Sequence, residues 1–587
     1  MEVWTPGPEG DPAIPMTRSL LTLSLLALLV AGCSKEEPPP QPLPFISDPL
    51  RADAGCDWAQ WGQNWAHTGQ ACVPAQGFAN ALGSVVFDPF VPQETAESGG
   101  DLYAHFGSPI VVGDDLYMEV KSGTYVSCQP PGSGMPAPCG LDAWDQQVWT
   151  VKHLAWVSGT LTPQASFASS WKPPPWQVVQ GWEPVFGPAV HDQTVWVPMA
   201  QGTVARLDRQ LGTPVVVNPF TDSNLQRYVT GPLVIDYDGT LLYNVVELDA
   251  LMPTTADAKG WLVRVPPSGA PAVVSYASIV AGAPSPADQC PSTYPSGSGP
   301  YPPPTPVPTV TCGSQRPGFN SGPAIGPGGI VFVVSRAHFA QNDSSLVALN
   351  PDLTPKWTFR MRELLSDGCG VLVNCRQGAP GGVDPLTGLK PSVWVNDEAS
   401  SVPVALPDGA VLYGGLTVYN GDRGHLVKVS PDGKLMGTYD FGWDVTPAVW
   451  VRNGTYSIIT KDNHYFAANG GEGPYDVTQL SRDLVPEWKF TSTQTQSCQA
   501  QPDGGLSCVS DHPSGFEWCV NAPAVGPDGT VYANSEDGRV YAIRQGGSLL
   551  QQRFLLQSLG AAYTPIAVDS KGRVYSMNGG VMTVVGQ

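Results

Sequence analysis

The stretch Asn521–Leu556, NAPAVGPDGTVYANSEDGRVYAIRQGGSLLQQRFLL, decides the fold. Its β-branched and aromatic residues are interrupted by turn residues, which predicts four short strands. We expect these strands at Ala522–Gly526, Thr530–Asn534, Arg539–Arg544 and Ser548–Leu556. The turns carry glycine, where a positive φ is needed. Four antiparallel strands of this length cannot cover both of their own faces, so the stretch predicts an array of similar units.

The same pattern recurs along the chain. Its marker is a proline, followed by a short apolar strand, a turn and an apolar–aromatic strand. The marker prolines are Pro109, Pro188, Pro232, Pro323, Pro403, Pro447, Pro523 and Pro565. The shortest spacings between them, 42 and 44 residues, fit a bare four-stranded unit, and the longer spacings fit a unit with an insertion. The markers therefore predict eight units.

The last unit lacks its outermost strand. Val581–Val585 supplies a third strand, and the sequence given then ends at Gln587. Leu82–Phe87 matches the outer strands of the other units and precedes the first marker. We therefore predict an all-β fold, a single eight-bladed β-propeller of four-stranded antiparallel blades. An N-terminal strand at about 82–88 would complete the last blade, close the ring and remove the free sheet edges.

The residues before the repeats are typical of an export signal. Arg18 precedes the apolar run Leu20–Ala31, which is too short for an ordinary membrane span. The run ends in Leu29-Val30-Ala31-Gly32-Cys33, which resembles the bacterial lipobox. That resemblance implies that Cys33 is lipidated and anchors the protein to a membrane; an ordinary secretory signal is the alternative.

Three regions follow from this interpretation. Residues 1–32 form the signal region, with Met16 as the expected start, and residues 33–55 form the lipidated cysteine and a Pro-rich tether. Residues 56–587 form the propeller, with disulfide-stapled loop insertions. Ser34 after the lipobox implies an outer-membrane lipoprotein of the bacterial cell envelope, facing the periplasm or the cell surface.

The net charge of −21 opposes binding to nucleic acid, so no nucleic-acid partner is expected. We also expect the propeller to be monomeric. Apart from Cys33, eleven cysteines remain, and an oxidising compartment makes disulfides the default. The candidate pairs are Cys56/Cys72, Cys128/Cys139, Cys290/Cys312, Cys369/Cys375 and Cys498/Cys508, which leaves Cys519 as a buried thiol. Zinc binding is the alternative, but no C-x2-C pair is present, so no metal site is predicted.

Two stretches carry a family resemblance. Ala348–Trp357, ALNPDLTPKW, resembles the blade motif of the PQQ-like, quinoprotein-type propellers, and Trp58–Gly69 resembles the opening of many bacterial members. The resemblance implies an eight-bladed propeller whose enzymatic members hold PQQ and Ca²⁺ in a central funnel. The chain has no adjacent cysteines and no Glu–Asn–Asp set that aligns with those enzymes, so no catalytic or cofactor-binding residue is assigned.

Strand parity places the insertions at one end of the ring, because loops after the second and fourth strands of each blade share an end. These insertions are Ser122–Gln147, Ser169–Glu183, Ile279–Pro317, Arg362–Asp397, Asp462–Asp476 and Ser492–Trp518. Function usually resides on loops held by a rigid scaffold. We expect a non-catalytic binding scaffold, without a cofactor, whose loop-rich end contacts a protein or glycan.

Two alternatives remain. One is a periplasmic PQQ-dependent dehydrogenase that needs Ca²⁺. The other is a carbohydrate-binding surface lipoprotein, in which Trp171, Trp176 and Trp182 of the insertion WKPPPWQVVQGW face the ligand.

Overall fold

The computed structural model describes residues 56–587, all of them within the compact unit Phe45–Gln587. Not described within that range are 98–99, 101, 103, 127–143, 176–182, 250–255, 292–307, 367–379, 384–387, 398, 400, 418–422, 453, 465–472, 503–504 and 560–563. Across the described part of the chain, no helix has the length and apolar character that a membrane crossing requires.

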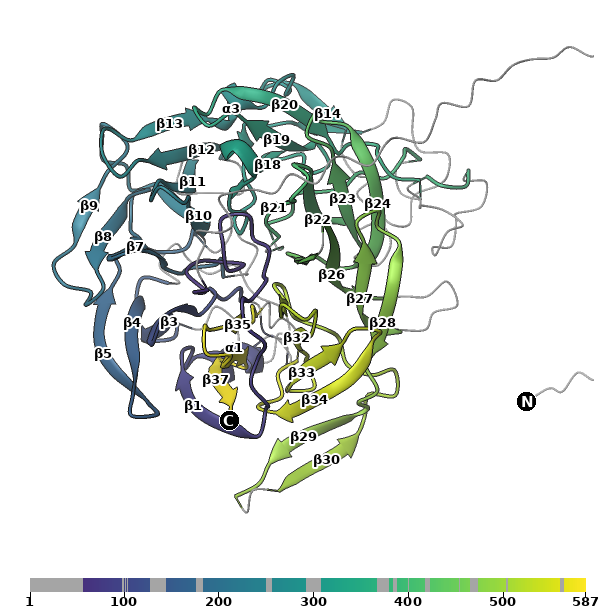
Figure 1. Ribbon diagram of the computed structural model, residues 1–587. Coiled ribbons are helices and arrows are strands. Elements are labelled where there is room, and N and C mark those ends of the chain that lie inside the picture. The colour runs from purple at the N-terminus through teal and green to yellow at the C-terminus, as the bar shows by residue number, and fades with distance from the viewer. Residues whose placement is uncertain are drawn as a thin grey trace, which may run out of the picture. The chain divides into compact units, whose positions relative to one another are not determined.

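The described strands form eight antiparallel sheets that follow one another around a ring (Figure 1). In each blade we name the strands A to D from the innermost to the outermost. Blades one to four are β2 (Ile110–Val112), β3 (Asp115–Gly123), β4 (Gln147–Val157) and β5 (Thr160–Ala168); β6 (Ala189–His191), β7 (Thr194–Pro198), β8 (Val204–Asp208) and β9 (Val215–Val217); β10 (Arg227–Ile235), β11 (Leu241–Leu248), β12 (Ala258–Val265) and β13 (Ala272–Ser275); β17 (Ala324–Ile325), β18 (Val331–Ala337), β19 (Ser344–Leu349) and β20 (Pro355–Arg360).

The other four blades repeat this order. They are β21 (Val404–Ala405), β22 (Val411–Thr417), β23 (Arg423–Val429) and β24 (Leu435–Gly442); β25 (Ala448–Arg452), β26 (Thr455–Asn463), β27 (Tyr475–Ser481) and β28 (Pro486–Thr491); β31 (Ala524–Val525), β32 (Val531–Asn534), β33 (Arg539–Arg544) and β34 (Ser548–Phe554); β35 (Ala567–Val568), β36 (Val574–Asn578), β37 (Val581–Gly586) and β1 (Asn80–Val86).

Smaller elements decorate the ring. They are α1 (Val91–Glu97), α3 (Tyr276–Ile279), the 3₁₀ turn η2 (Pro327–Gly329), the strand β16 (Gln315–Arg316) beside β18, and the hairpins β14 (Gln289–Pro291) with β15 (Thr309–Thr311) and β29 (Gln496–Ala500) with β30 (Leu506–Ser510). The β29–β30 hairpin projects beyond the blades in Figure 1.

The predicted all-β, eight-bladed fold is confirmed. The predicted closing strand is β1, which pairs with β37 from Asn80 opposite Gly586 to Val86 opposite Val581. In blade seven the predicted third strand, Arg539–Arg544, is observed as β33 with the same bounds. The predicted first strand is shorter than expected, because β31 covers only Ala524–Val525.

The inner strands form the core and the outer strands face solvent. All four residues of β32 are buried, whereas β34 is mostly exposed or half-buried. Inner strands are covered on both faces by neighbouring blades, and each fully buried Val or Ile contributes about 1.5–3 kcal/mol. This sandwiching explains why the inner strands are nearly continuous apolar runs instead of alternating ones.

The ring has two unlike ends. The turn end carries the A–B and C–D turns, such as Gly526–Thr530 and Arg544–Gly547, which close with short backbone hydrogen bonds. Gly529 has a φ of 80° in its turn, which only glycine adopts easily. The loop end carries the B–C and D–A connections, and by the observed strand order every predicted insertion starts and ends there.

The segment Trp58–Gln76 crosses the turn end and hydrogen bonds to successive blades; we call it the N-terminal plug. Its backbone bonds to the A strands of blades one, two, four, five, six and seven through Trp58, Ala59, Trp65, Ala66, Thr68 and Gly69, respectively. The Gln60 side chain hydrogen bonds to the backbone of Ile235 in blade three. The backbone N–H of Gln76 donates to the carbonyl oxygen of Gly572 in blade eight. A single segment therefore contacts all eight blades.

Two predicted disulfides are confirmed: Cys290–Cys312 and Cys498–Cys508. The second joins directly opposite residues of the β29–β30 hairpin. Cys519 is a buried thiol, as expected. The predicted Cys56–Cys72 disulfide is wrong for this structure, in which the two thiols form a hydrogen bond. Partial burial, together with the Cys56 contact, raises the pKa of Cys72 to about 12, which disfavours the reactive thiolate. Cys33, Cys128, Cys139, Cys369 and Cys375 lie outside the described residues.

Candidate functional site

The axis of the ring is filled by side chains. Trp61 of the plug is 3 % exposed and packs with Val185, Val402 and Ala522, which precede the A strands of blades two, five and seven. Residues from opposite sides of a ring can meet only near its axis. The centre of the described propeller is therefore a packed core at the level of Trp61.

Toward the loop end, the side chains that lie near the axis are polar. The amide of Asn320, before blade four, contacts His105 Nδ1 at 3.3 Å and donates to the carbonyl oxygen of Asp397 at 3.1 Å. Its oxygen accepts the backbone N–H of Val185, before blade two. These residues are buried or close to it, so their polar groups must be satisfied by one another. Asn320 thereby joins the segment before blade four to the segments before blades one, two and five.

A second set of axial contacts continues around the ring. Asn521 donates to Asp444 Oδ2 at 3.0 Å and accepts the backbone N–H of Thr446 at 2.9 Å. Ser321 donates to the carbonyl oxygen of Ser401 at 3.0 Å. We refer to His105, Asn320, Ser321, Asp397, Ser401, Asp444 and Asn521 as the axial network.

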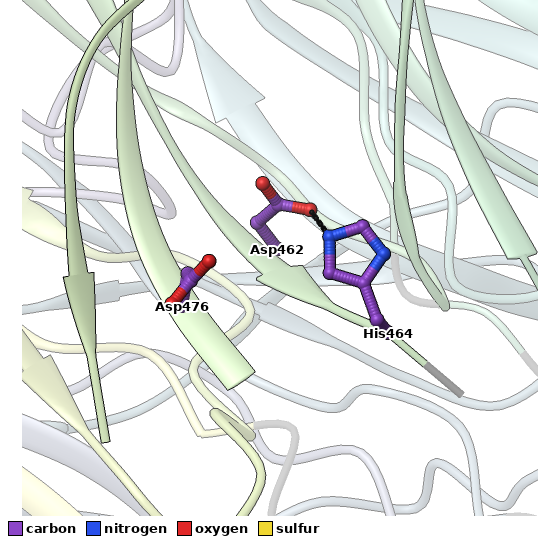
Figure 2. Close-up of side chains that lie close together, drawn as sticks. All are labelled: Asp462, His464 and Asp476. Carbon is purple, nitrogen blue, oxygen red and sulfur yellow. Dashed lines mark ion pairs between the residues drawn. The ribbon is translucent and has the colours of Figure 1, made fainter. Parts of the chain in front are cut away.

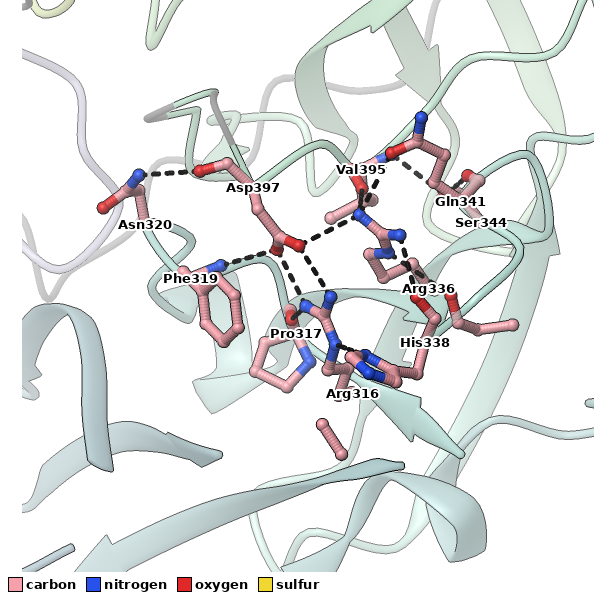
Figure 3. Close-up of polar contacts among 12 residues, drawn as sticks. Arg316, Pro317, Phe319, Asn320, Arg336, His338, Gln341, Ser344, Val395 and Asp397 are labelled. Carbon is pink, nitrogen blue, oxygen red and sulfur yellow. Dashed lines mark hydrogen bonds and ion pairs between the residues drawn. The ribbon is translucent and has the colours of Figure 1, made fainter. Parts of the chain in front are cut away.

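Asp397 is the charged centre of this network (Figure 3). Arg316 binds both of its carboxylate oxygens, at 2.7 and 2.6 Å, and Arg336 adds a contact at 3.1 Å. Burial alone would raise the pKa of the Asp397 carboxyl, but the two guanidinium groups outweigh it, and the net pKa is lowered. Arg316 also donates to His338, whose pKa falls to about 3 because the ring is buried and lies beside two cations.

A second buried ion cluster joins the first and last blades. Lys121, on β3, contacts Asp88 at 2.5 Å, Glu183 at 2.6 Å and Glu94 of α1 at 3.2 Å. Trp149 donates to Glu183 at 2.7 Å. Burial opposes the charge on Lys121, but the surrounding carboxylates raise its pKa well above the usual value. Burial likewise raises the pKa of Glu94 to about 8, so the cluster holds fewer negative charges than carboxyl groups at neutral pH.

A third cluster lies on blade six, where β26 and β27 reach the loop end (Figure 2). Asp462 and Asp476 are opposite each other on β26 and β27, and His464 follows Asp462 by two residues. One donor atom of each residue lies within 4.8 Å of the other two. Burial acts to raise the pKa of Asp462, but His464 and Lys489 have the larger effect, and the net pKa is lowered to about 2. Asp462 is therefore ionised at neutral pH.

A pocket of about 230 Å³ opens at the loop end between blades one, two and three. Its lining includes Trp144, Lys172, Tyr228 and the exposed Leu225. The Lys172 ammonium donates to the carbonyl oxygens of Trp144, Asp145 and Gln147, and burial lowers its pKa. Lys172 therefore anchors one insertion on another.

The structure corrects one predicted ligand-facing aromatic residue. Trp171 is 1 % exposed, packs against Trp149 and Phe186, and donates its indole N–H to Val229 at 2.9 Å. Its large apolar surface is used between blades, so the prediction that it faces a ligand is wrong. Trp176 and Trp182 lie outside the described residues.

Sequence reasoning missed all three charged clusters. Their members come from distant parts of the chain, as with Arg316 and Asp397. The blade-six cluster did have a local signal: Asp462 and His464 alternate on a strand, which places both side chains on one face. The paired strand then places Asp476 beside them.

The strand order defines an eight-bladed β-propeller. No protein-family model and no curated protein matches the chain. Among solved structures it is similar to a europium-containing methanol dehydrogenase (12 % identity, 90 % of both chains, TM-score 0.47). It is also similar to BamB from Moraxella catarrhalis (14 %, 82 % of this chain and 95 % of that one, 0.36). A quinohemoprotein alcohol dehydrogenase from Comamonas testosteroni also matches (12 %, 92 % and 78 %, 0.46). The similarity is one of fold, and the blade assignment rests on the strand pairing itself.

Proposed function

We propose that this protein is a lipid-anchored, extracytoplasmic scaffold that binds a partner through the loop end of its propeller, without catalysis. The observation that carries the proposal is the filled axis. Trp61 and the axial network occupy the centre of the ring, where a cofactor funnel would otherwise lie. The partner would then bind the loop end, which carries the insertions.

Contacts among the described residues hold the bases of several insertions in place. Lys172 joins two insertions, the Cys290–Cys312 disulfide staples a third, and the Arg316–Asp397 pair fixes the end of a fourth. Rigid loops lose less conformational entropy when a partner binds. The pocket between blades one, two and three, with Trp144 and Tyr228 in its lining, gives this surface a concave feature that suits an aromatic or glycan contact.

The anchor follows from the sequence alone. Cys33 of the lipobox would carry the lipid, and residues 33–55 would hold the propeller away from the bilayer of a bacterial outer membrane. Metabolic labelling with an alkyne fatty acid tests this part: the wild-type protein should be labelled and Cys33→Ala should not.

Photo-crosslinking in cells tests the binding surface. A photoreactive amino acid is placed at Leu225 or Val509, which are 74 % and 64 % exposed at the loop end. The matched turn-end positions are Tyr237 and Val485, at 48 % and 59 %. We expect defined crosslinked products from loop-end positions and few from the turn end. Equal yields from both ends, or products only from the turn end, would refute the proposed surface.

A further inference from the structure

We propose that Asp462, His464 and Asp476 form a binding site for a first-row divalent transition-metal ion at the loop end of blade six. The backbone explains why these residues meet. Asp462 and His464 share one face of β26 and its continuation, and Asp476 is the cross-strand partner of Asp462 on β27. The His464 backbone is held by hydrogen bonds to Gly473 and Pro474.

The two carboxylates are divided between two tasks. Lys489 binds the Oδ2 atoms, at 2.6 Å from Asp462 and 3.5 Å from Asp476. Tyr439 and Thr478 also donate to Asp462 Oδ2, at 2.7 and 3.1 Å. Asp462 Oδ1 faces His464, whereas Asp476 Oδ1 has no hydrogen-bond partner among the described residues, although Asp476 is only 2 % exposed. A buried carboxylate oxygen without a donor is costly, so Asp476 Oδ1 points to a missing cation.

The imidazole supplies the third ligand. His464 Nε2 lies 3.0 Å from Asp462 Oδ1 and forms an ion pair with it (Figure 2). Two ligand atoms that each lie about 2.1 Å from one ion are about 3.0–3.4 Å apart in octahedral or tetrahedral geometry. The observed separation therefore suits two ligands of one ion. Tyr439 and Thr478 would act behind the ligands and hold Asp462 in place.

The ligand set selects the class of ion. Ca²⁺ prefers six to eight oxygen ligands, and Mg²⁺ usually keeps several waters and avoids imidazole. One imidazole with two carboxylates suits Zn²⁺, Mn²⁺ or Fe²⁺. Two carboxylates against one lysine also leave a net negative charge, which the ion would offset. A bound ion would join the two strands at the base of the Asp462–Asp476 insertion.

Calorimetric titration with Zn²⁺ tests the site. The full chain, purified without a histidine tag and stripped with EDTA, should bind one equivalent. His464→Gln should weaken binding at least about tenfold, because one of three protein ligands is lost. The control is His512→Gln, since His512 also contacts an aspartate and its side chain has the same 28 % exposure as that of His464. The control should bind as the wild type does.

Lys489→Met provides an effect of opposite sign. It removes the cation that competes for the carboxylates, so Zn²⁺ should bind more tightly and raise the melting temperature more than in the wild type. Unfolding curves in EDTA show that each variant is folded. Absence of one-to-one Zn²⁺ binding by the folded wild type would overturn the site, as would equal affinity in His464→Gln and wild type.

Discussion

At the scale of single residues, Asp397 shows how this protein handles buried charge. Two arginines and a backbone N–H surround one carboxylate at the axis. Such a cluster gains little over an apolar core, but it becomes very costly when one member is lost, because the remaining charges stay buried. The axial charges therefore add little to stability. Their main effect is to specify one arrangement of blades four and five.

Asp397→Asn should lower the free energy of unfolding by about 3–5 kcal/mol, because two buried guanidinium groups lose their counter-charge. Urea denaturation followed by tryptophan fluorescence measures the loss. Asp432→Asn is the control, since Asp432 pairs with Lys434 at the surface and its side chain is 61 % exposed. It should unfold as the wild type does, and an equal loss in both variants would contradict the role given to Asp397.

His67 predicts how stability changes with pH. It is fully buried in the plug and its Nδ1 lies 2.8 Å from the carbonyl oxygen of Pro403, and burial lowers its pKa from 6.5 to about 4. His67 therefore binds a proton near pH 6.5 in the unfolded chain but only near pH 4 in the folded chain. Stability is complete above pH 6.5 and falls as the pH drops toward 4, by up to about 3 kcal/mol. His338 acts in the same direction.

The measurement is the urea midpoint between pH 7 and pH 4. The slope should be smaller in His67→Gln than in the wild type. An identical slope in His67→Gln and wild type would show that His67 does not titrate on unfolding.

At the scale of elements, blade strands could be predicted and the plug could not. Arg539–Arg544 alternates side chains between two buried faces, and that local pattern is enough to define β33. The plug has no such period, because its residues bond to a different blade almost at every step. Its Trp58, Trp61 and Trp65 are buried by tertiary contacts that no local pattern encodes.

Trp61→Ala tests the plug as an element. The indole fills the axis between three blades, so its loss should cost about 3–5 kcal/mol. Trp450→Ala is the control, because Trp450 is only partly buried on β25 and should cost less. Denaturant unfolding of both variants measures the difference. If Trp450→Ala proved the more destabilising, the axis would not be the packed core described above.

At the scale of the whole molecule, ring closure has two parts. The β1–β37 ladder was predictable, because the last blade lacked a strand and the first repeat had one in excess. The ion cluster of Lys121 was not, since it joins Asp88 after β1 with Glu183 before blade two. These ion pairs connect the first and last blades, next to the backbone hydrogen bonds between β1 and β37.

Lys121→Met should destabilise the ring by about 3–5 kcal/mol at pH 7, because buried carboxylates lose their cation. The loss should shrink on mild acidification, since burial raises the pKa of Glu183, which then takes up a proton in the folded state. Thermal unfolding at pH 7 and pH 5.5 measures both effects. Lys571→Met, at an exposed pair with Asp114, is the control and should change little. A loss independent of pH would argue against this account of the cluster.

We propose that the axis is the packed core of a binding scaffold and not a cofactor funnel. Reconstitution of the purified full chain with PQQ and Ca²⁺ tests it most directly, with alcohols as substrates and an artificial dye as electron acceptor. We expect no quinone absorbance that stays with the protein after gel filtration, and no PQQ-dependent dye reduction. Stoichiometric quinone retention together with dye reduction would contradict it.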